Sequence, residues 1–393
     1  MKTGFLLSVL FLLSSCTGCS SGDDSVEPIP VPEPEPEPAV EQTYASGVKL
    51  RGGDISELTY VEQNGGKYYL DGKAQDCLDI LQQAGINVVR LRLYNDPGNK
   101  DYSPSNRLPA GIQDEDDILS LAKRAKDHGM QIVLSFHYSD YWTNGETQII
   151  PHEWEAQPSV DSLGHRVYDY TVAFLKRMEA QNTLPEYVAL GNEIQAGILY
   201  PTGKVANVDN LCQLLQRGAE AVRAAAPRAK IILHLDGGGD KDKYNWFFGE
   251  MRSHGVDYDV IGASYYPFWT GKRCDEIAAW ADEVIRTFNK PMLLMETGYA
   301  WTANLPDGTG GQLSHNKPYT DLSPKGQKDF MIELNRAISQ TSATGQILGY
   351  LYWDPVMIEA NGIGWELGAK NVVSNSTFFD FKGNALPVLE AFK

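Results

Sequence analysis

Cysteine is scarce in this sequence. Only 5 of its 393 residues are cysteines, and two of these lie close to the N-terminus. The other three, Cys77, Cys212 and Cys274, are an odd number, and none belongs to a Cys-x-x-Cys pair. A disulfide framework and a cysteine-based zinc site are therefore not indicated, and we predict three buried thiols.

Basic residues are also few relative to acidic ones. The chain has 34 lysines and arginines against 51 acidic residues, a net charge of −17. Residues 1–41 hold one lysine and seven acids, a net −6, which leaves −11 for the remainder. A domain this acidic lacks the basic surface needed to bind nucleic acid or a polyanionic sugar, so we expect no nucleic-acid partner.

The hydrophobic segment at the N-terminus is too short for a stable membrane span. Met1-Lys2 precede the apolar stretch Phe5–Leu13 and then small residues, a pattern typical of a secretory signal. Leu13-Ser14-Ser15-Cys16 resembles the bacterial lipobox, in which the cysteine becomes the lipidated first residue of the mature chain. We predict a signal peptide over 1–15, lipidation of Cys16 and export to the cell surface as a membrane-anchored lipoprotein. Lipidation of Cys19 and an ordinary cleaved signal are the alternatives.

Residues 16–45 are expected to form an extended stalk. Proline and glutamate alternate along much of Pro28–Pro38, which prevents helix and sheet hydrogen bonding and makes the segment repel itself. From about Lys49 onward, short apolar runs alternate with amphipathic stretches. We therefore predict one folded domain over 46–393.

Repeated β-α units predict a parallel sheet in this domain. A helical pattern over Cys77–Ala84 ends at Gly85, and another over Ile118–His128 ends at Gly129, as C-cap glycines do. The apolar runs number eight, which predicts an α/β fold with a (β/α)8 TIM barrel. They are Lys49–Asp54, Asn87–Leu93, Gln131–His137, Tyr187–Glu193, Lys230–Leu235, Val260–Tyr266, Pro291–Glu296 and Ile347–Trp353.

Two of these strands end in a glutamate. Glu193 closes the fourth and Glu296 the seventh, so both carboxylates are expected at the C-terminal rim, where TIM barrels place their active sites. Retaining glycosidases hold two carboxylates roughly 5 Å apart, one as nucleophile and the other as acid and then base. The pair therefore predicts cleavage of a glycosidic bond.

Other polar residues lie at the ends of neighbouring strands. Arg90 and Arg92 share one face of their strand, and an arginine beside a catalytic carboxylate stabilises its charged form. We expect only one of them to reach the nucleophile. His137 and His234 are predicted to be hydrogen-bond donors to the substrate or the carboxylates, because His-x-His and His-Glu-x-x-His metal motifs are absent.

Aromatic residues are well placed to stack on sugar rings. Trp353 ends strand eight and is expected to form the platform under the sugar at the cleavage site. Tyr265 and Tyr266 end strand six, and a phenol there is placed to donate a hydrogen bond to Glu296. The longest loops, 139–159, 299–323 and 354–384, supply further aromatic side chains to the same face.

Six motifs in order resemble the endo-β-1,4-galactanases of glycoside hydrolase family 53, from about Leu50 to the C-terminus. They are Gly53-Asp54-Ile55-Ser56, Val89-Arg90-Leu91-Arg92-Leu93-Tyr94-Asn95-Asp96-Pro97, Phe136-His137-Tyr138-Ser139-Asp140-Tyr141-Trp142, Gly191-Asn192-Glu193-Ile194, Ser264-Tyr265-Tyr266-Pro267-Phe268-Trp269 and Glu296-Thr297-Gly298-Tyr299.

The resemblance implies a retaining barrel enzyme of clan A. Glu193 would be the acid/base, Glu296 the nucleophile and Asn192 the partner of the sugar 2-hydroxyl. Substrate-binding residues expected from these motifs include Asp96, Asp140 and Trp142. Some bacterial members hold a calcium ion between the loops after strands seven and eight. The corresponding loop here is poor in acids, and Asp307 is its one candidate ligand.

We therefore expect a monomeric arabinogalactan endo-β-1,4-galactanase that needs no cofactor for catalysis and acts within the galactan side chains of pectin. Another clan A endoglycanase, such as a mannanase or xylanase, is the alternative within the enzyme class. A non-catalytic glycan-binding lipoprotein is the alternative outside it, although stacking alone would not need both glutamates.

Overall fold

The computed structural model describes residues 41–102, 107–156 and 158–393. The predicted signal peptide, Cys16, Cys19 and most of the stalk lie outside these residues. The chain from Gln42 to Lys393 forms one compact unit. Among the described residues, no helix combines the length and the apolar character that a bilayer crossing requires.

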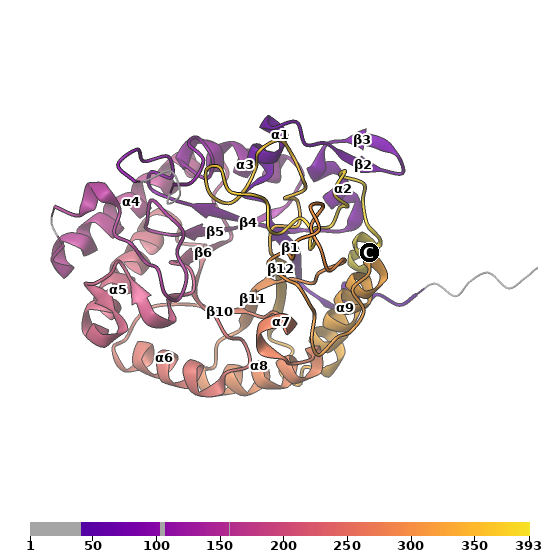
Figure 1. Ribbon diagram of the computed structural model, residues 1–393. Helices are drawn as coiled ribbons and strands as arrows, with labels where there is room; N and C mark the ends of the chain where they lie inside the picture. Colours follow the sequence, from indigo (N-terminus) through magenta and orange to yellow (C-terminus); the bar gives the residue numbers. More distant parts are fainter. Residues whose placement is uncertain (1–40, 103–106, 157) are drawn as a thin grey trace, which may run out of the picture. The chain divides into compact units, whose positions relative to one another are not determined.

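The core of the domain is a closed barrel of eight parallel strands, as predicted (Figure 1). Their order around the barrel is β1-β12-β11-β10-β9-β6-β5-β4, so successive barrel strands are neighbours and the ring closes between β12 and β1. The strands are β1 Leu50–Asp54, β4 Val88–Leu93, β5 Gln131–Phe136, β6 Tyr187–Leu190, β9 Lys230–Leu235, β10 Val260–Ser264, β11 Met292–Thr297 and β12 Ile347–Tyr352.

Helices surround this barrel on the outside (Figure 1). They are α1 Leu58–Gln63, α2 Cys77–Ala84, α3 Glu115–Asp127, α4 Val160–Ala180, α5 Val208–Ala225, α6 Lys241–Ser253, α8 Cys274–Phe288 and α9 Pro324–Arg336. The short helix α7 Pro267–Thr270 lies instead in the loop that follows β10. Two small hairpins, β2 Tyr68–Leu70 with β3 Lys73–Gln75 and β7 Gly197–Ile198 with β8 Gly203–Lys204, lie outside the barrel sheet.

Apolar side chains pack in two layers. An inner cluster takes at least one residue from each barrel strand, including Val88 of β4, and so fills the barrel interior. A larger cluster lies between the strands and the surrounding helices. Cys77, Cys212 and Cys274 are buried free thiols, as predicted.

The boundaries of two elements differ from the sequence prediction for local reasons. Helix α3 begins at Glu115, before the predicted Ile118, because the Asp114 side chain accepts a hydrogen bond from the Asp117 amide and caps the helix. Strand β6 ends at Leu190 and not at Glu193. Gly191 and Glu193 have positive φ angles of 85° and 49°, which turn the chain at the barrel rim.

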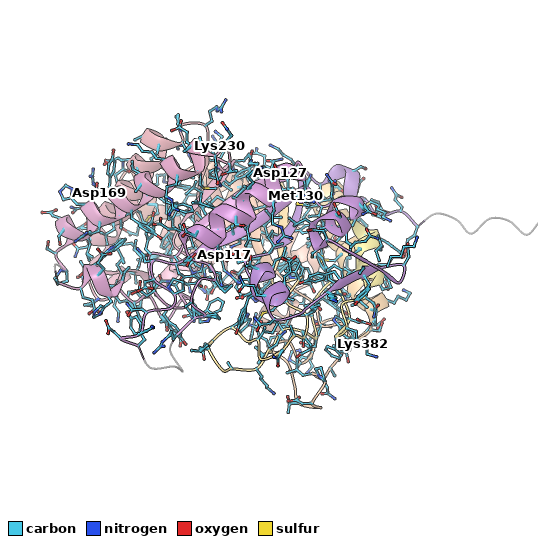
Figure 2. The ribbon with its side chains drawn as sticks, turned by 90° about the horizontal axis from the view of Figure 1, so that it is seen from above. Asp117, Asp127, Met130, Asp169, Lys230 and Lys382 are labelled. Carbon is cyan, nitrogen blue, oxygen red and sulfur yellow. The ribbon has the colours of Figure 1, made fainter. Side chains whose placement is uncertain are left out.

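The barrel has two distinct ends. Lys230 begins β9 and marks the N-terminal end of the strands, whereas Lys382 lies in the segment that follows β12. Figure 2 shows these two lysines on opposite sides of the molecule, with α3 running between them from Asp117 to Asp127. The residues predicted to carry the chemistry follow the C-terminal ends of the strands.

Candidate active site

A cleft of about 690 Å³ opens at the C-terminal ends of the barrel strands. Its lining includes the carboxylates of Glu193, Asp236, Glu296 and Glu366, together with four tryptophans. Among the described residues that line it, none is a lysine or an arginine. The surface is therefore acidic and rich in aromatic rings, which suits a neutral sugar better than an anionic one.

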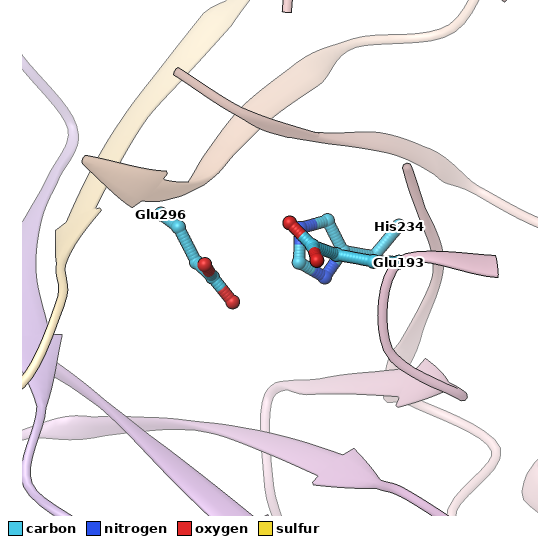
Figure 3. A group of neighbouring side chains, drawn as sticks. All are labelled: Glu193, His234 and Glu296. Atoms are coloured by element: carbon cyan, nitrogen blue, oxygen red, sulfur yellow. The ribbon is translucent and has the colours of Figure 1, made fainter. Parts of the chain in front are cut away.

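Glu193 and Glu296 face each other across the floor of this cleft (Figure 3). Glu296 comes from β11, and Glu193 follows β6 at the turn described above. A carboxylate oxygen of each and a ring nitrogen of His234 lie within 4.8 Å of one another. This spacing fits the roughly 5 Å separation of retaining glycosidases and is too short for the water held between the carboxylates of an inverting enzyme.

Arg90 joins the two carboxylate-bearing segments from below. Its Nη1 lies 2.6 Å from Glu296 Oε1, and its Nη2 donates to Asn192 Oδ1 at 2.6 Å. Asn192 in turn donates through Nδ2 to the Thr143 carbonyl at 2.8 Å. The guanidinium is fully buried, so its charge acts on Glu296 with little screening by water.

Glu193 has a different environment. Burial and the charge of Glu296 raise the pKa of Glu193 well above its ordinary value, although the Ser264 hydroxyl opposes this by donating to Oε1 at 2.8 Å. A raised pKa keeps a carboxyl protonated nearer to neutral pH, as a general acid requires. Glu296, by contrast, accepts from Arg90 and from the Tyr266 hydroxyl, the latter at 3.0 Å.

Arg92 lies under the aromatic part of the cleft and does not reach Glu296. It pairs with Glu57 at 3.2 Å and Asp354 at 3.0 Å. Its guanidinium carbon is 4.4 Å from the ring centre of Trp353 and 5.1 Å from that of Trp142. Arg92 is fully buried, so it supports these two cleft tryptophans and is not placed to contact a sugar directly.

Of the residues predicted to bind substrate, Asn192, Trp142, Tyr266 and Trp353 line the cleft, and several others do not. Asp96 is exposed outside it. Asp140 accepts hydrogen bonds from the amides of Asp96 and His152 and so fixes a loop. Tyr265 is buried and donates to the Lys272 carbonyl at 2.9 Å. For these three residues, the prediction from the motifs missed the direction in which the side chain points.

The two predicted histidines are buried below the cleft. His137 Nδ1 lies 2.7 Å from the Thr143 hydroxyl, and its ring packs 4.4 Å from that of Tyr94. His234 Nε2 lies 2.9 Å from the Ser264 hydroxyl. Burial and nearby arginine charge hold the pKa of both rings well below the ordinary value, so both are neutral. Neither lines the cleft, so direct donation to substrate is not supported.

The residues around Asp307 do not fit a calcium site. Asp307 is exposed, and its Oδ2 lies 3.2 Å from the Lys370 ammonium while its Oδ1 accepts from Thr309. Among the described residues, the one group of side chains spaced for a metal ion is Glu193, His234 and Glu296. Arg90 already lies against Glu296 there, and its positive charge opposes a cation.

Several residues that line the cleft were not predicted from the sequence. Asp236 directly follows the strand predicted over Lys230–Leu235, the same signal that pointed to Glu193, and could have been found by it. Gln312 and Glu366 come from the long loops after β11 and β12. Irregular loops have no period, so nothing in the sequence indicates which of their side chains face the cleft.

Comparison with known proteins identifies one family of relatives. The model of glycosyl hydrolase family 53 matches residues 50–392. The arabinogalactan endo-beta-1,4-galactanase of Cellvibrio japonicus (strain Ueda107) is 32% identical over 362 residues, which cover 87% of this chain and 90% of that protein. The endo-beta-1,4-galactanase of Bacillus subtilis (strain 168) is 30% identical over 377 residues, covering 88% and 85%.

A solved structure shares the fold over almost the whole domain. The Ignisphaera aggregans GH53 catalytic domain superimposes with a TM-score of 0.82 and 34% identity, covering 91% of this chain and 98% of that one. The family match spans the barrel and both glutamates. The resemblance inferred from six short motifs is thereby confirmed, and the chain belongs to glycosyl hydrolase family 53.

Proposed function

We propose that this chain is a retaining endo-β-1,4-galactanase that cleaves within the galactan side chains of pectin. The observation that carries the proposal is the pair of facing carboxylates, Glu193 and Glu296, within 4.8 Å in an open cleft. The galactanase names of its relatives supply the substrate class and favour it over mannan or xylan. A non-catalytic binding role would leave the pair and its hydrogen bonds without a use.

In this mechanism Glu296 attacks the anomeric carbon while Glu193 gives its proton to the departing glycosidic oxygen. A covalent galactosyl-enzyme forms, and Glu193 then removes a proton from the water that opens it. Arg90 and Tyr266 hold Glu296 in position through hydrogen bonds to its two oxygens. Asn192 would bind the 2-hydroxyl, and Trp353 would form the platform beneath the sugar.

The stereochemistry of the first product tests this mechanism. Two inversions at the anomeric carbon give net retention, so the new reducing end should appear first as the β-anomer. Proton NMR during the first minutes of galactan digestion, before mutarotation, would show it. An initial excess of the α-anomer would exclude the double displacement and the roles assigned to both glutamates.

A substrate panel tests the specificity separately. Galactan, arabinan, mannan and xylan would be incubated with the protein and the products sized. We expect mixed galacto-oligosaccharides from galactan alone, since an endo-acting enzyme cuts at internal bonds. Preferential cleavage of mannan or xylan would assign the site to another endoglycanase activity.

Catalysis by two carboxylates needs no cofactor. We propose that the loops after β11 and β12 are held by protein contacts, such as Lys370 with Asp307, without a calcium ion.

We further propose that the protein is an exported, monomeric lipoprotein anchored at the cell surface through Cys16. Support comes from the lipobox-like Leu13-Ser14-Ser15-Cys16 and from the proline- and glutamate-rich segment after it. The anchor would hold the catalytic domain at the membrane surface while the stalk lets the cleft reach polysaccharide.

A further inference from the structure

A chain of hydrogen bonds leads from the barrel interior to Glu193. His234 of β9 lies with Nε2 2.9 Å from the hydroxyl of Ser264, the last residue of β10. The same hydroxyl lies 2.8 Å from Glu193 Oε1. His234 is 0% exposed, and Ser264, which lines the cleft, is 4% exposed. Arg90 donates instead to Glu296 and Asn192, and Asn192 donates to the Thr143 carbonyl.

The number of protons in this chain fixes its direction. The Ser264 hydroxyl has one proton, and giving it to Glu193 Oε1 means that His234 must donate to the serine oxygen. A neutral imidazole has one N–H, which must then be on Nε2. The reverse direction would turn the lone pairs of Ser264 toward Glu193 and leave the carboxylate without this donor. His234 Nδ1 has no hydrogen-bond partner among the described residues, so no second contact favours the other tautomer.

We propose that His234 and Ser264 are positioning residues that form a one-way relay, Nε2–H to Oγ and Oγ–H to Oε1, which keeps the exchangeable proton of Glu193 on Oε2. With Oε1 occupied as an acceptor, Oε2 is the oxygen left to protonate the leaving group in the first step. It is also the oxygen left to accept a proton from water in the second. The inference rests on the proposed function, in which Glu193 is the acid/base.

The relay also has a definite electrostatic sign. A hydroxyl that donates to a carboxylate stabilises its charged form, so Ser264 lowers the pKa of Glu193, against burial and the charges of Glu296 and Asp236. Charged and titratable groups face Glu193 from several elements: Glu296 from β11, Asp236 after β9, Arg90 from β4, Tyr266 after β10 and Tyr244 from α6. Deleting the Ser264 hydroxyl removes its hydrogen bond to Glu193 without changing any of these charges.

Two measurements on Ser264→Ala test the relay. The first is a carbon-13 NMR titration of the Glu193 carboxyl in the substrate-free protein, assigned by its disappearance in Glu193→Gln. The second is the alkaline limb of kcat/KM on galactan, which reports the acid of the free enzyme. Loss of the donor should move both to higher pH by roughly one unit. Ser264→Thr keeps a hydroxyl and should return both toward the wild-type values.

A matched pair at position 234 tests the direction of the relay. Glutamine can present its amide N–H near the position of Nε2, whereas asparagine presents it near Nδ1. His234→Gln should therefore retain the wild-type titration, and His234→Asn should shift it in the same direction as Ser264→Ala. Both variants are uncharged, as His234 is, so charge does not differ within the pair.

The relay is wrong if Ser264→Ala leaves the Glu193 titration unchanged, or lowers kcat at every pH without moving the alkaline limb. It is also wrong if the two position-234 variants titrate alike. The NMR titration requires no turnover, so it tests the relay even if galactan is not the substrate. Failure of the wild-type protein to cleave galactan would count against the proposed function alone.

Discussion

At the residue scale, one buried arginine organises the reaction centre. Arg90 donates to Glu296 from one nitrogen and to Asn192 from another, both at 2.6 Å. The planar guanidinium has donors in a fixed fork, so it sets the nucleophile and the residue next to the acid/base in register with each other. Arg92, two positions along the same strand, shares Asp54 with Arg90 but otherwise pairs with Glu57 and Asp354.

Removing the acid/base should affect substrates unequally. A poor leaving group needs a proton and a good one does not, so Glu193→Ala should lose about 10²–10⁴-fold in kcat on galactan. It should lose far less on an aryl galactoside with an activated leaving group. Added azide should restore turnover of that substrate and yield a β-galactosyl azide. Equal losses on both substrates, with no azide adduct, would exchange the roles of the two glutamates.

Asp236 should shift the pH dependence in a predictable direction. Its negative charge raises the pKa of Glu193, so Asp236→Asn should lower that pKa. The general acid then loses its proton at lower pH, and the alkaline limb of kcat/KM moves down by roughly half a unit. The Lys243 ammonium, 2.6 Å from Asp236, loses this ion pair in the variant. Its positive charge is then no longer offset by Asp236 and also lowers the pKa of Glu193.

The matched control for this shift is Asp242→Asn. Asp242 is exposed in the first turn of α6 and does not line the cleft, so the variant changes net charge equally without touching the site. Its pH profile should match that of the wild type. An upward shift in Asp236→Asn, or the same shift in both variants, would contradict the local effect of Asp236.

At the element scale, the strands were predictable and the loops were not. Each barrel strand is buried on both faces and reads as an apolar run, so all eight were recognised within a few residues. Glu193 and Glu296 could be found because they follow such runs. Glu366, which hydrogen-bonds to Tyr141, lies in a loop whose path depends on tertiary contacts, and no local pattern encodes that path.

The same distinction explains the errors at strand ends. Residues inside a strand alternate between two faces, so the shared face of Arg90 and Arg92 could be predicted from their spacing. Tyr265 and Tyr266 follow the last residue of β10, where alternation stops. One phenol reaches Glu296 and the other points away to Lys272, a difference that adjacent tyrosines in a sequence cannot reveal.

The loops after β11 and β12 should keep their arrangement without calcium. Lys370 contacts Asp307, and Asn375 donates to the carbonyls of Thr302 and Leu313 at 3.0 and 2.8 Å. These contacts join the loops through protein groups alone. Excess EDTA should therefore leave the melting temperature and galactan hydrolysis unchanged, and added calcium should raise neither. A melting temperature that rises with calcium concentration would show an ion bound to the folded state.

At the scale of the whole molecule, the negative charge of the domain is compatible with a neutral substrate. Residues 42–393 carry a net charge of −11, and the cleft contains four carboxylates without a lining lysine or arginine among the described residues. Neutral galactan can enter such a cleft, whereas the galacturonate-containing backbone that bears it would be repelled. The expected result is cutting within the side chains, away from the acidic backbone.

The remaining prediction concerns the membrane anchor. If Cys16 carries the lipid, wild-type protein should partition with membranes and resist a high-salt wash, since acyl chains bind through buried apolar surface and not through charge. Cys16→Ala should be released or remain unprocessed, while the galactan activity of the folded domain stays unchanged. Cys19→Ala is the matched control, three residues away, and should remain anchored. Release of Cys19→Ala with retention of Cys16→Ala would assign the lipid to Cys19, and retention of both would exclude a single thiol-linked anchor at either position.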